Sequence, residues 1–208
     1  MDHLLVDPVN PDPALVARAA GLILAGGVVA YPTDTLYGLA VDPRNAHAIE
    51  RLFAIKDRAV DQPVPVIAAD SGQVERGVGH LSDLARRLAV RFWPGPLTLI
   101  VQASPLISPL VHRGAGAVAV RVPDHAVARM LAAQCGGAIT STSANRSGEP
   151  APDAADRIAQ SIREQIDMLL DAGATPGGLP STIVNVMGEG PVLVREGVVR
   201  WARVLECV

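Results

Sequence analysis

Cysteine is scarce in this sequence, and no hydrophobic run is long. Among 208 residues only Cys135 and Cys207 are cysteines, and they lie far apart without the paired spacing of a zinc site. We therefore expect two reduced thiols rather than a disulfide framework. The longest apolar stretch, residues 21–31, is about half of the roughly 20 residues that a membrane-spanning helix needs. Because the first residues also lack the basic segment of a signal peptide, these absences predict a soluble, cytoplasmic protein.

Several nucleotide-binding and hydrolytic signatures are also missing. The only lysine follows Ile55 rather than a glycine, which excludes a Walker A loop. No GxGxxG pattern follows an expected strand, which argues against a dinucleotide site. The sequence has neither the GxSxG of many serine hydrolases nor the HExxH of many zinc enzymes. We expect no protein-held metal ion, no serine-hydrolase triad, and five histidines that lie mostly at the surface.

Composition and charge are those of a folded globular protein. Hydrophobic residues make up 49% of the chain and charged residues 19%. The length fits one domain, which we place at residues 1–208. The formal net charge is −3, whereas general nucleic-acid binders are usually basic. Any anion site must therefore be a local cluster of cations.

The periodicity of the apolar residues predicts an α/β fold. Asp12 and Pro13 are typical of a helix start, and Gly26-Gly27 of its end. Because several neighbouring strands have no helix between them, we expect a mixed sheet with flanking helices. Further helices are expected from residue 42 onward, from Ser82 to near Trp93, over 124–134 and over 153–166. Strands are expected at 28–31, 64–68 (an edge strand, because of Pro65), 97–101, 118–122, 138–141, 168–170, 182–186 and 192–194.

The scarcity of lysine is the sharpest feature of the composition. The 18 basic residues include a single lysine, Lys56, so all the others are arginines. Lysine is a compact, mobile point charge, whereas arginine presents a planar fork. Lys56 and Arg58 stand two residues apart near an expected helix end, where cations also favour the helix dipole. A phosphate-binding role and a solvated helix end therefore both explain the pair.

Polar residues gather in loops that follow strands or helices, where α/β folds place their ligands. Hydroxyl, amide and main-chain N–H groups beside Lys and Arg suit a polyanion such as a triphosphate. No nucleophile–base pair is evident, so any chemistry would depend on positioning and electrostatics. The alternatives are an ordinary turn at the serine-rich loop, a structural ion pair at Arg121 and a simple helix stop at the Pro-Gly-Pro run. The segments are 32–38, 56–58, 93–98, Arg121, 141–148, 181–182 and 195–197.

These segments carry a resemblance to a known family, in order along nearly the whole chain. The sequence resembles the YrdC-like threonylcarbamoyl-AMP synthases, whose hallmark pairs a KxR with a distant SxN. The resemblance implies a twisted, mostly mixed sheet with flanking helices and a concave, positively charged groove. The matching motifs are KDR at 56–58, SAN at 143–145, PTDTLYG at 32–38, FWPGPLT at 92–98, VAVRVP at 118–123, STIV at 181–184 and VREG at 194–197.

The resemblance also implies an activity. ATP, L-threonine and bicarbonate would give threonylcarbamoyl-AMP and pyrophosphate, normally with Mg²⁺. The product would feed a separate transferase that modifies adenosine 37 of tRNA (t6A). Lys56 and Arg58 are implied as the catalytic cations. The implied ATP contacts are Lys56, Arg58, Gln62, Ser143, Asn145 and Arg195, and the implied threonine contacts are Thr35, Arg121, Ser141 and Ser181.

Three positions depart from the family pattern. Ala59 stands where a proline is common, Gln62 where an asparagine is common, and Ile67 where a histidine is common. Residues 57–62 or 146–151 are expected to close over the site, because water would destroy a mixed anhydride product. The rival interpretations are an enzyme of the same superfamily with another acyl acceptor, a double-stranded RNA or tRNA binding module that uses the groove, and a non-catalytic sensor of ATP or an amino acid. Weak binding of tRNA by the synthase itself is also expected.

Overall fold

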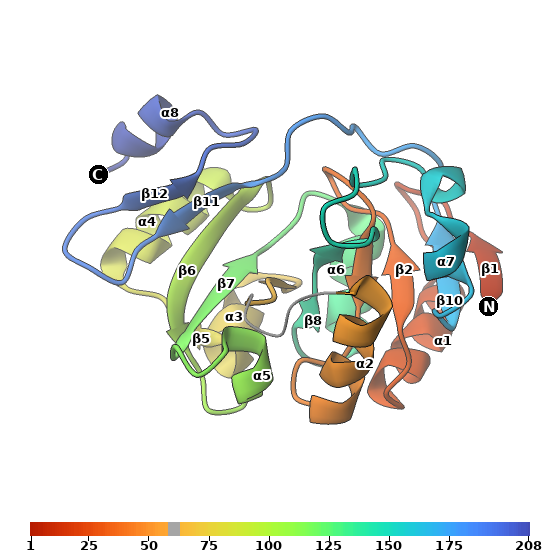
Figure 1. Ribbon diagram of the computed structural model, residues 1–208. Helices are drawn as coiled ribbons and strands as arrows, with labels where there is room; N and C mark the ends of the chain where they lie inside the picture. The colour runs from red at the N-terminus through yellow and green to blue at the C-terminus, as the bar shows by residue number, and fades with distance from the viewer. Residues whose placement is uncertain (58–62) are drawn as a thin grey trace.

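Two mixed β-sheets lie side by side in the computed structural model, which describes residues 1–57 and 63–208 (Figure 1). The first sheet has the strand order β1-β10-β2-β3-β9, in which β1, β10 and β2 are parallel to one another and β3 is antiparallel to both of its neighbours, β2 and β9. Its strands are β1 (Asp2–Leu5), β2 (Val29–Tyr31), β3 (Gly38–Ala40), β9 (Thr142–Ser143) and β10 (Met168–Asp171).

The second sheet has the order β12-β11-β6-β7-β4-β8, with β5 also paired to β6. Parallel pairs (β11 with β6, β7 with β4) alternate with antiparallel ones, as predicted for a mixed sheet. Its strands are β4 (Val66–Ile67), β5 (Gly79–His80), β6 (Leu97–Ala103), β7 (Ala117–Arg121), β8 (Ile139–Thr140), β11 (Thr182–Asn185) and β12 (Val192–Arg195).

Helices cover both sheets. Because alternate residues of a strand face opposite sides, Val29 and Tyr31 pack with α1 and α6, while Val28 and Ala30 pack into the larger core with α2. The helices are α1 (Pro13–Leu24), α2 (Ala46–Lys56), α3 (Ser71–Gly77), α4 (Asp83–Phe92), α5 (Pro109–His112), α6 (Ala126–Gln134), α7 (Gln160–Arg163) and α8 (Trp201–Leu205), with a 3-10 turn at Ala155–Arg157. None of the helices in the described residues has the length and apolar composition that crossing a membrane requires.

Local capping explains where several helices begin. The Asp12 side chain accepts from the N–H of Ala14, and Pro13 opens α1 as predicted. The prediction that α2 begins at residue 42 is wrong. The Asp42 carboxylate instead binds Arg44, and the Asn45 side chain caps the helix by accepting from Ala48.

Two further sequence predictions are wrong. Residues 64–68 are not an edge strand, because β4 lies between β7 and β8 and Pro65 falls just outside the paired residues. Residues 153–166 are not one helix, because Ile158 adopts an extended backbone between the 3-10 turn and α7. The apolar spacing is still used, since Ile158 and Ile162 both reach the core across this break.

Candidate active site

A cavity of about 820 Å³ is lined by residues of both sheets. Strands β3 and β9 contribute from the first sheet, and β4, β6, β7, β11 and β12 from the second. Every predicted site residue in the described part of the chain lines it, and so does Ile67. Arg58, Ala59 and Gln62 lie outside the described residues. The predicted residues that line it are Thr35, Lys56, Arg121, Ser141, Ser143, Asn145, Ser181 and Arg195.

The path of the chain between the sheets brings these residues together. β8 pairs with β4 in the second sheet, yet β9 pairs with β3 in the first, so the chain changes sheets at Ser141. The N–H of Ser141 donates to the Pro65 carbonyl at 2.8 Å. The chain crosses again between β10 and β11, over residues 172–181. Site residues therefore come from crossings and from the ends of strands, where α/β folds place their ligands.

Lys56 joins the end of α2 to the Ser143–Asn145 loop. Its Nζ donates to the main-chain oxygens of Ser143 at 2.5 Å and Asn145 at 2.7 Å, and lies 3.3 Å from Asn145 Oδ1. Ser147 returns a main-chain bond to the Lys56 carbonyl. Lys56 is only 3% exposed, and a buried ammonium is tolerated only when such acceptors surround it. Lys56, the first residue of the KDR motif, is thus bonded directly to the distant SAN motif.

The Asn145 side chain fixes the shape of this loop. Its Oδ1 accepts from Ser143 Oγ at 2.5 Å, and its Nδ2 donates to the Glu149 carbonyl at 2.5 Å. Gly148 has a φ of +87°, a conformation that favours glycine, and it allows the turn between these contacts. The serine-rich segment is therefore a specifically bonded loop rather than an ordinary turn.

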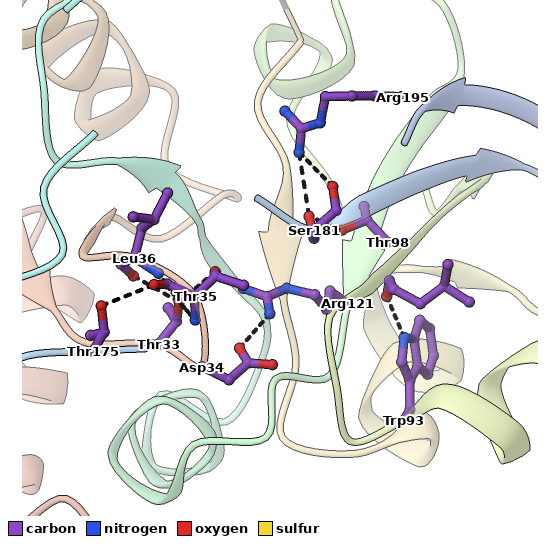
Figure 2. Close-up of polar contacts among 11 residues, drawn as sticks. Thr33, Asp34, Thr35, Leu36, Trp93, Thr98, Arg121, Thr175, Ser181 and Arg195 are labelled. Carbon is purple, nitrogen blue, oxygen red and sulfur yellow. Dashed lines mark hydrogen bonds and ion pairs between the residues drawn. The ribbon is translucent and has the colours of Figure 1, made fainter. Parts of the chain in front are cut away.

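Arg121, at the end of β7, forms an ion pair with Asp34 (Figure 2). NH1 of its guanidinium bonds Asp34 Oδ1, and NH2 lies 3.5 Å from Thr35 Oγ1. Thr35 Oγ1 in turn lies 3.0 Å from Thr33 Oγ1. Arg121 therefore makes the structural ion pair that one interpretation expected and also lines the cavity, while its contact with a substrate stays a prediction.

Ser181 and Arg195 form the part of the wall that the second sheet supplies. Thr98 donates its hydroxyl to Ser181 Oγ at 2.9 Å, and Arg195 NH2 donates to the Ser181 carbonyl at 2.8 Å (Figure 2). The backbone at Gly197 approaches this segment so closely that a Cβ there would lie 2.0 Å from the Pro180 carbonyl oxygen. Gly197 also donates its N–H to Thr182 Oγ1. The close approach of Gly197 and its hydrogen bond to Thr182 together hold Arg195 against Ser181.

Electrostatics favour an anion in the cavity. Burial lowers the pKa of Arg195, and the positive charge of Arg121 lowers it further. Two guanidinium groups that repel each other across a cavity are stabilised by an anion between them. Among residues 1–57 and 63–208, no Asp or Glu side chain lines the cavity. Nor do any three or more His, Cys, Asp or Glu residues of these ranges form a group able to hold a metal ion.

Four residues that support the site were not assigned roles from the sequence. Asp34, Thr33 and Thr98 lie inside motifs that the sequence analysis quoted, and that placement was the available signal. No sequence signal marked Thr175, because it lies in the small-residue segment 171–179. Its hydroxyl lies 2.9 Å from the Thr35 carbonyl oxygen, and Gly177 donates to the same oxygen at 3.0 Å. Residues 172–181 are thus tied to the first sheet beside the predicted threonine contacts.

The Pro-Gly-Pro run has a structural role. The Trp93–Pro94 bond is cis, and Trp93 Nε1 donates to the Leu97 carbonyl at 2.6 Å (Figure 2). Gly95 donates its N–H to the Val122 carbonyl. The run therefore joins the end of α4 to β6 and β7, one residue beyond Arg121.

Sequence comparison finds close relatives with one activity. The sequence model of the family Sua5_yciO_yrdC, described as "Telomere recombination", matches residues 21–197. The chain is 38% identical over 194 residues to the threonylcarbamoyl-AMP synthase of Bacillus subtilis (strain 168), covering 93% of this chain and 56% of that protein. It is 37% identical over 190 residues to the threonylcarbamoyl-AMP synthase of Halorhodospira halophila (strain DSM 244 / SL1), covering 91% of this chain and 94% of that protein.

Solved structures agree with the sequence relatives. Sua5 of P. abyssi, complexed with L-threonine, has a TM-score of 0.94 at 33% identity, covering 100% of this chain and 61% of that chain. YciO of E. coli has a TM-score of 0.86 at 25% identity, covering 96% of this chain and 98% of that chain. The chain spans a little over half the length of the B. subtilis relative. The mixed α/β fold and the resemblance predicted from sequence are confirmed, and the chain belongs to the Sua5/YciO/YrdC family.

Proposed function

We propose that this protein is an L-threonylcarbamoyladenylate synthase, a nucleotidyltransferase that uses ATP, L-threonine and bicarbonate. The observation that carries the proposal is that, within the described residues, the predicted ATP contacts and the predicted threonine contacts line one cavity. Its volume, about 820 Å³, is in the range of small-molecule sites, roughly 300–1,000 Å³. The names of the sequence relatives and the threonine complex of P. abyssi Sua5 support the same activity.

The amino-acid substrate would bind at the Arg121 end of the cavity. A guanidinium is the natural partner of an α-carboxylate, because its fork matches two carboxylate oxygens. The hydroxyls of Thr35, Ser141 and Ser181 line the same cavity and can exchange hydrogen bonds with the amine and hydroxyl of threonine.

The nucleotide would bind along Lys56 and the Ser143–Asn145 loop, reaching to Arg195. Arg58 and Gln62 are proposed to join these contacts from residues outside the described ranges. Because no carboxylate among the described residues lines the cavity, Mg²⁺ would enter as part of the substrate, held by phosphate oxygens. When bound there it would neutralise phosphate charge.

The chemistry would depend on positioning rather than on a protein nucleophile. The threonine amine captures bicarbonate as a carbamate, and water leaves. A carbamate oxygen then attacks the α-phosphorus, and the bond from that phosphorus to the bridging oxygen breaks with its electrons on pyrophosphate. Lys56 and Arg58 stabilise the charge that develops on the phosphates, as cations do in a site that excludes water. The Lys56 ammonium is held by the Ser143 and Asn145 oxygens, so it is oriented before substrate arrives.

Purified protein with ATP and Mg²⁺ tests this proposal when L-threonine and bicarbonate are added singly and together. We expect pyrophosphate and a product of threonylcarbamoyl-AMP mass only with all components present. Bound ATP and threonine without turnover would favour the sensor of the same fold. RNA binding that weakens steeply with salt, without turnover, would favour the RNA-binding module.

The product would be consumed by a separate transferase that modifies adenosine 37 of tRNA, in the cytoplasm. Residues 146–151 are proposed as a closing loop, because Ser147, Gly148, Pro150 and Ala151 line the cavity. Amide exchange in this loop should slow when ATP and threonine are both present. Equal exchange with and without the ligands would contradict closure.

A further inference from the structure

Asp34 contacts Arg121 but does not line the cavity. The Arg121 and Asp34 side chains are only 7% and 9% exposed, and NH1 of Arg121 bonds Asp34 Oδ1. Arg121 lines the cavity, whereas Asp34 is not among the described residues that do. Figure 2 shows the carboxylate on one side of the guanidinium and Ser181 and Arg195 beyond the other. Asp34 is therefore placed to act on a ligand through the orientation of Arg121 rather than by direct contact.

The second oxygen of Asp34 has an unusual environment. Oδ2 is buried and, within the described part of the chain, has no hydrogen-bond partner. An unbonded buried carboxylate oxygen reduces the stability of a fold. The carboxylate also acts electrostatically on His125, the N-cap residue of α6. Since half of its bonding capacity is unused, the contribution of Asp34 is concentrated in its contact with Arg121.

Arg121 needs such a partner to face a ligand. A guanidinium that is nearly out of solvent and feels the charge of Arg195 is unfavourable without a counter-charge. A bond at NH1 also fixes the plane of the rigid guanidinium fork. NH2 then lies 3.5 Å from Thr35 Oγ1, on the side of a residue that lines the cavity.

We propose that Asp34 is a positioning residue for the amino-acid substrate, which holds the Arg121 guanidinium in the orientation that receives the substrate carboxylate. This assignment rests on the proposed function, because it takes Arg121 as the carboxylate partner. A positioning role requires more of Asp34 than a negative charge. The position of the acceptor oxygen should matter more than the charge behind it.

The test is direct binding of L-threonine and, separately, of ATP by titration calorimetry, with a thermal melt of each variant. Asp34→Ala should raise the Kd for threonine about tenfold and change the Kd for ATP by no more than about twofold. Asp34→Asn keeps an acceptor oxygen at the same place, so its Kd for threonine should stay within about threefold of the wild-type value. Asp34→Glu keeps the charge but moves it by one methylene, so it should weaken threonine binding about as much as Asp34→Ala does. Asp124→Asn is the control, because it alters an exposed acid that also acts on His125. It should change the affinity for neither ligand.

Arg121→Gln separates failure of this inference from failure of the proposed function. If wild-type protein does not bind threonine, the proposed function is overturned and the assignment with it. If Arg121→Gln weakens threonine but no Asp34 variant does, only the positioning role is overturned. A charge role replaces it if Asp34→Glu restores threonine binding and Asp34→Asn does not. Equal loss of both ligands in a variant with a lowered melting temperature would assign Asp34 to folding alone. Asp34→Asn and Asp34→Glu decide the matter should Asp34→Ala fail to fold.

Discussion

The ammonium of Lys56 lies 2.7 Å from the main-chain oxygen of Asn145, although the two residues are 89 positions apart in the chain. The contact means that the single lysine of the protein organises a loop as well as carrying a charge. A main-chain oxygen cannot be altered by substitution, so the residue to change is Lys56 itself.

Lys56→Ala should lower the rate of pyrophosphate release by about 10²-fold, the scale of one lost electrostatic stabiliser. Lys56→Arg should also be impaired, because a planar fork cannot reproduce the contacts of an ammonium with the Ser143 and Asn145 oxygens. Steady-state kinetics with a thermal melt of each variant check this. Arg87→Ala, an exposed cation on α4, is the control and should be active. Near-normal turnover of Lys56→Ala would remove Lys56 from the mechanism.

Gly197→Ala should disturb the wall that holds Ser181 and Arg195. The new Cβ would lie 2.0 Å from the Pro180 carbonyl oxygen, so the two segments must separate. Overpacking of this kind costs about 1–3 kcal/mol, or roughly 2–4 °C of melting temperature per kcal/mol for a protein of this size. Threonine affinity should fall as well. Gly188→Ala, where a Cβ meets nothing within 4 Å, is the matched control. Equal melting temperatures for the two variants would show that the contact relaxes freely.

Thr175→Val should loosen residues 172–181 from the first sheet. The change removes the hydroxyl that donates toward the carbonyls of Thr35 and Asp153, while the main-chain bonds to both carbonyls remain. One such bond contributes about 1 kcal/mol, so threonine should bind about fivefold more weakly. Thr175→Ser keeps the donor and should bind normally. Calorimetric titration distinguishes the two, and identical affinities would assign the anchoring to the main chain alone.

Stability should fall as the pH drops below about 6.5, in part through His125. Burial lowers the pKa of His125 from 6.5, although Asp34 and Asp124 act to raise it. The unfolded state therefore binds this proton more readily than the folded state, and the stability present above pH 6.5 is lost on acidification. His125→Asn cannot titrate and should melt with a shallower pH dependence between pH 7 and 5. His47→Asn, at an exposed histidine, should keep the wild-type slope.

Carboxylates act in a separate pH window. The pKa of Asp167 is lowered from 3.8, because Arg51 and the Val28 N–H stabilise its charge more than burial opposes it. Its contribution is present above that value and is lost only below it. A slope between pH 7 and 5 that is unchanged in His125→Asn would therefore exclude His125 as its source.

Elements with local signals were predictable from sequence. Asp12 and Ser82 are capping residues in the structure, as their place before apolar periodic segments indicated. The strands near residues 97, 118, 168, 182 and 192 are also confirmed, because each is a short apolar run between turn residues. By contrast, the break at Ile158 leaves the apolar spacing unchanged, so periodicity alone could not reveal it.

Long-range pairing was not predictable. The division into two sheets depends on the change of partner at Ser141, which no local pattern encodes. The motifs did identify polar side chains that line the cavity, since they lie at the ends of strands and helices or in the loops beside them. They did not identify Asp34 as the partner of Arg121, because the two are 87 residues apart and nothing in either segment specifies the other.

The change of sheets at Ser141 also sets the order of events when the chain is made. The cavity needs Lys56, then Ser141, and then Ser181 and Arg195, which come at the end of the crossing from β10 to β11 and after it. A growing chain that ends before β11 has the strands of the first sheet but lacks one wall of the cavity. Contacts of such large sequence separation form late, because loop closure must come first. Ligand capture should therefore mark the completion of folding, and a truncated nascent chain gains no protection from ATP or threonine.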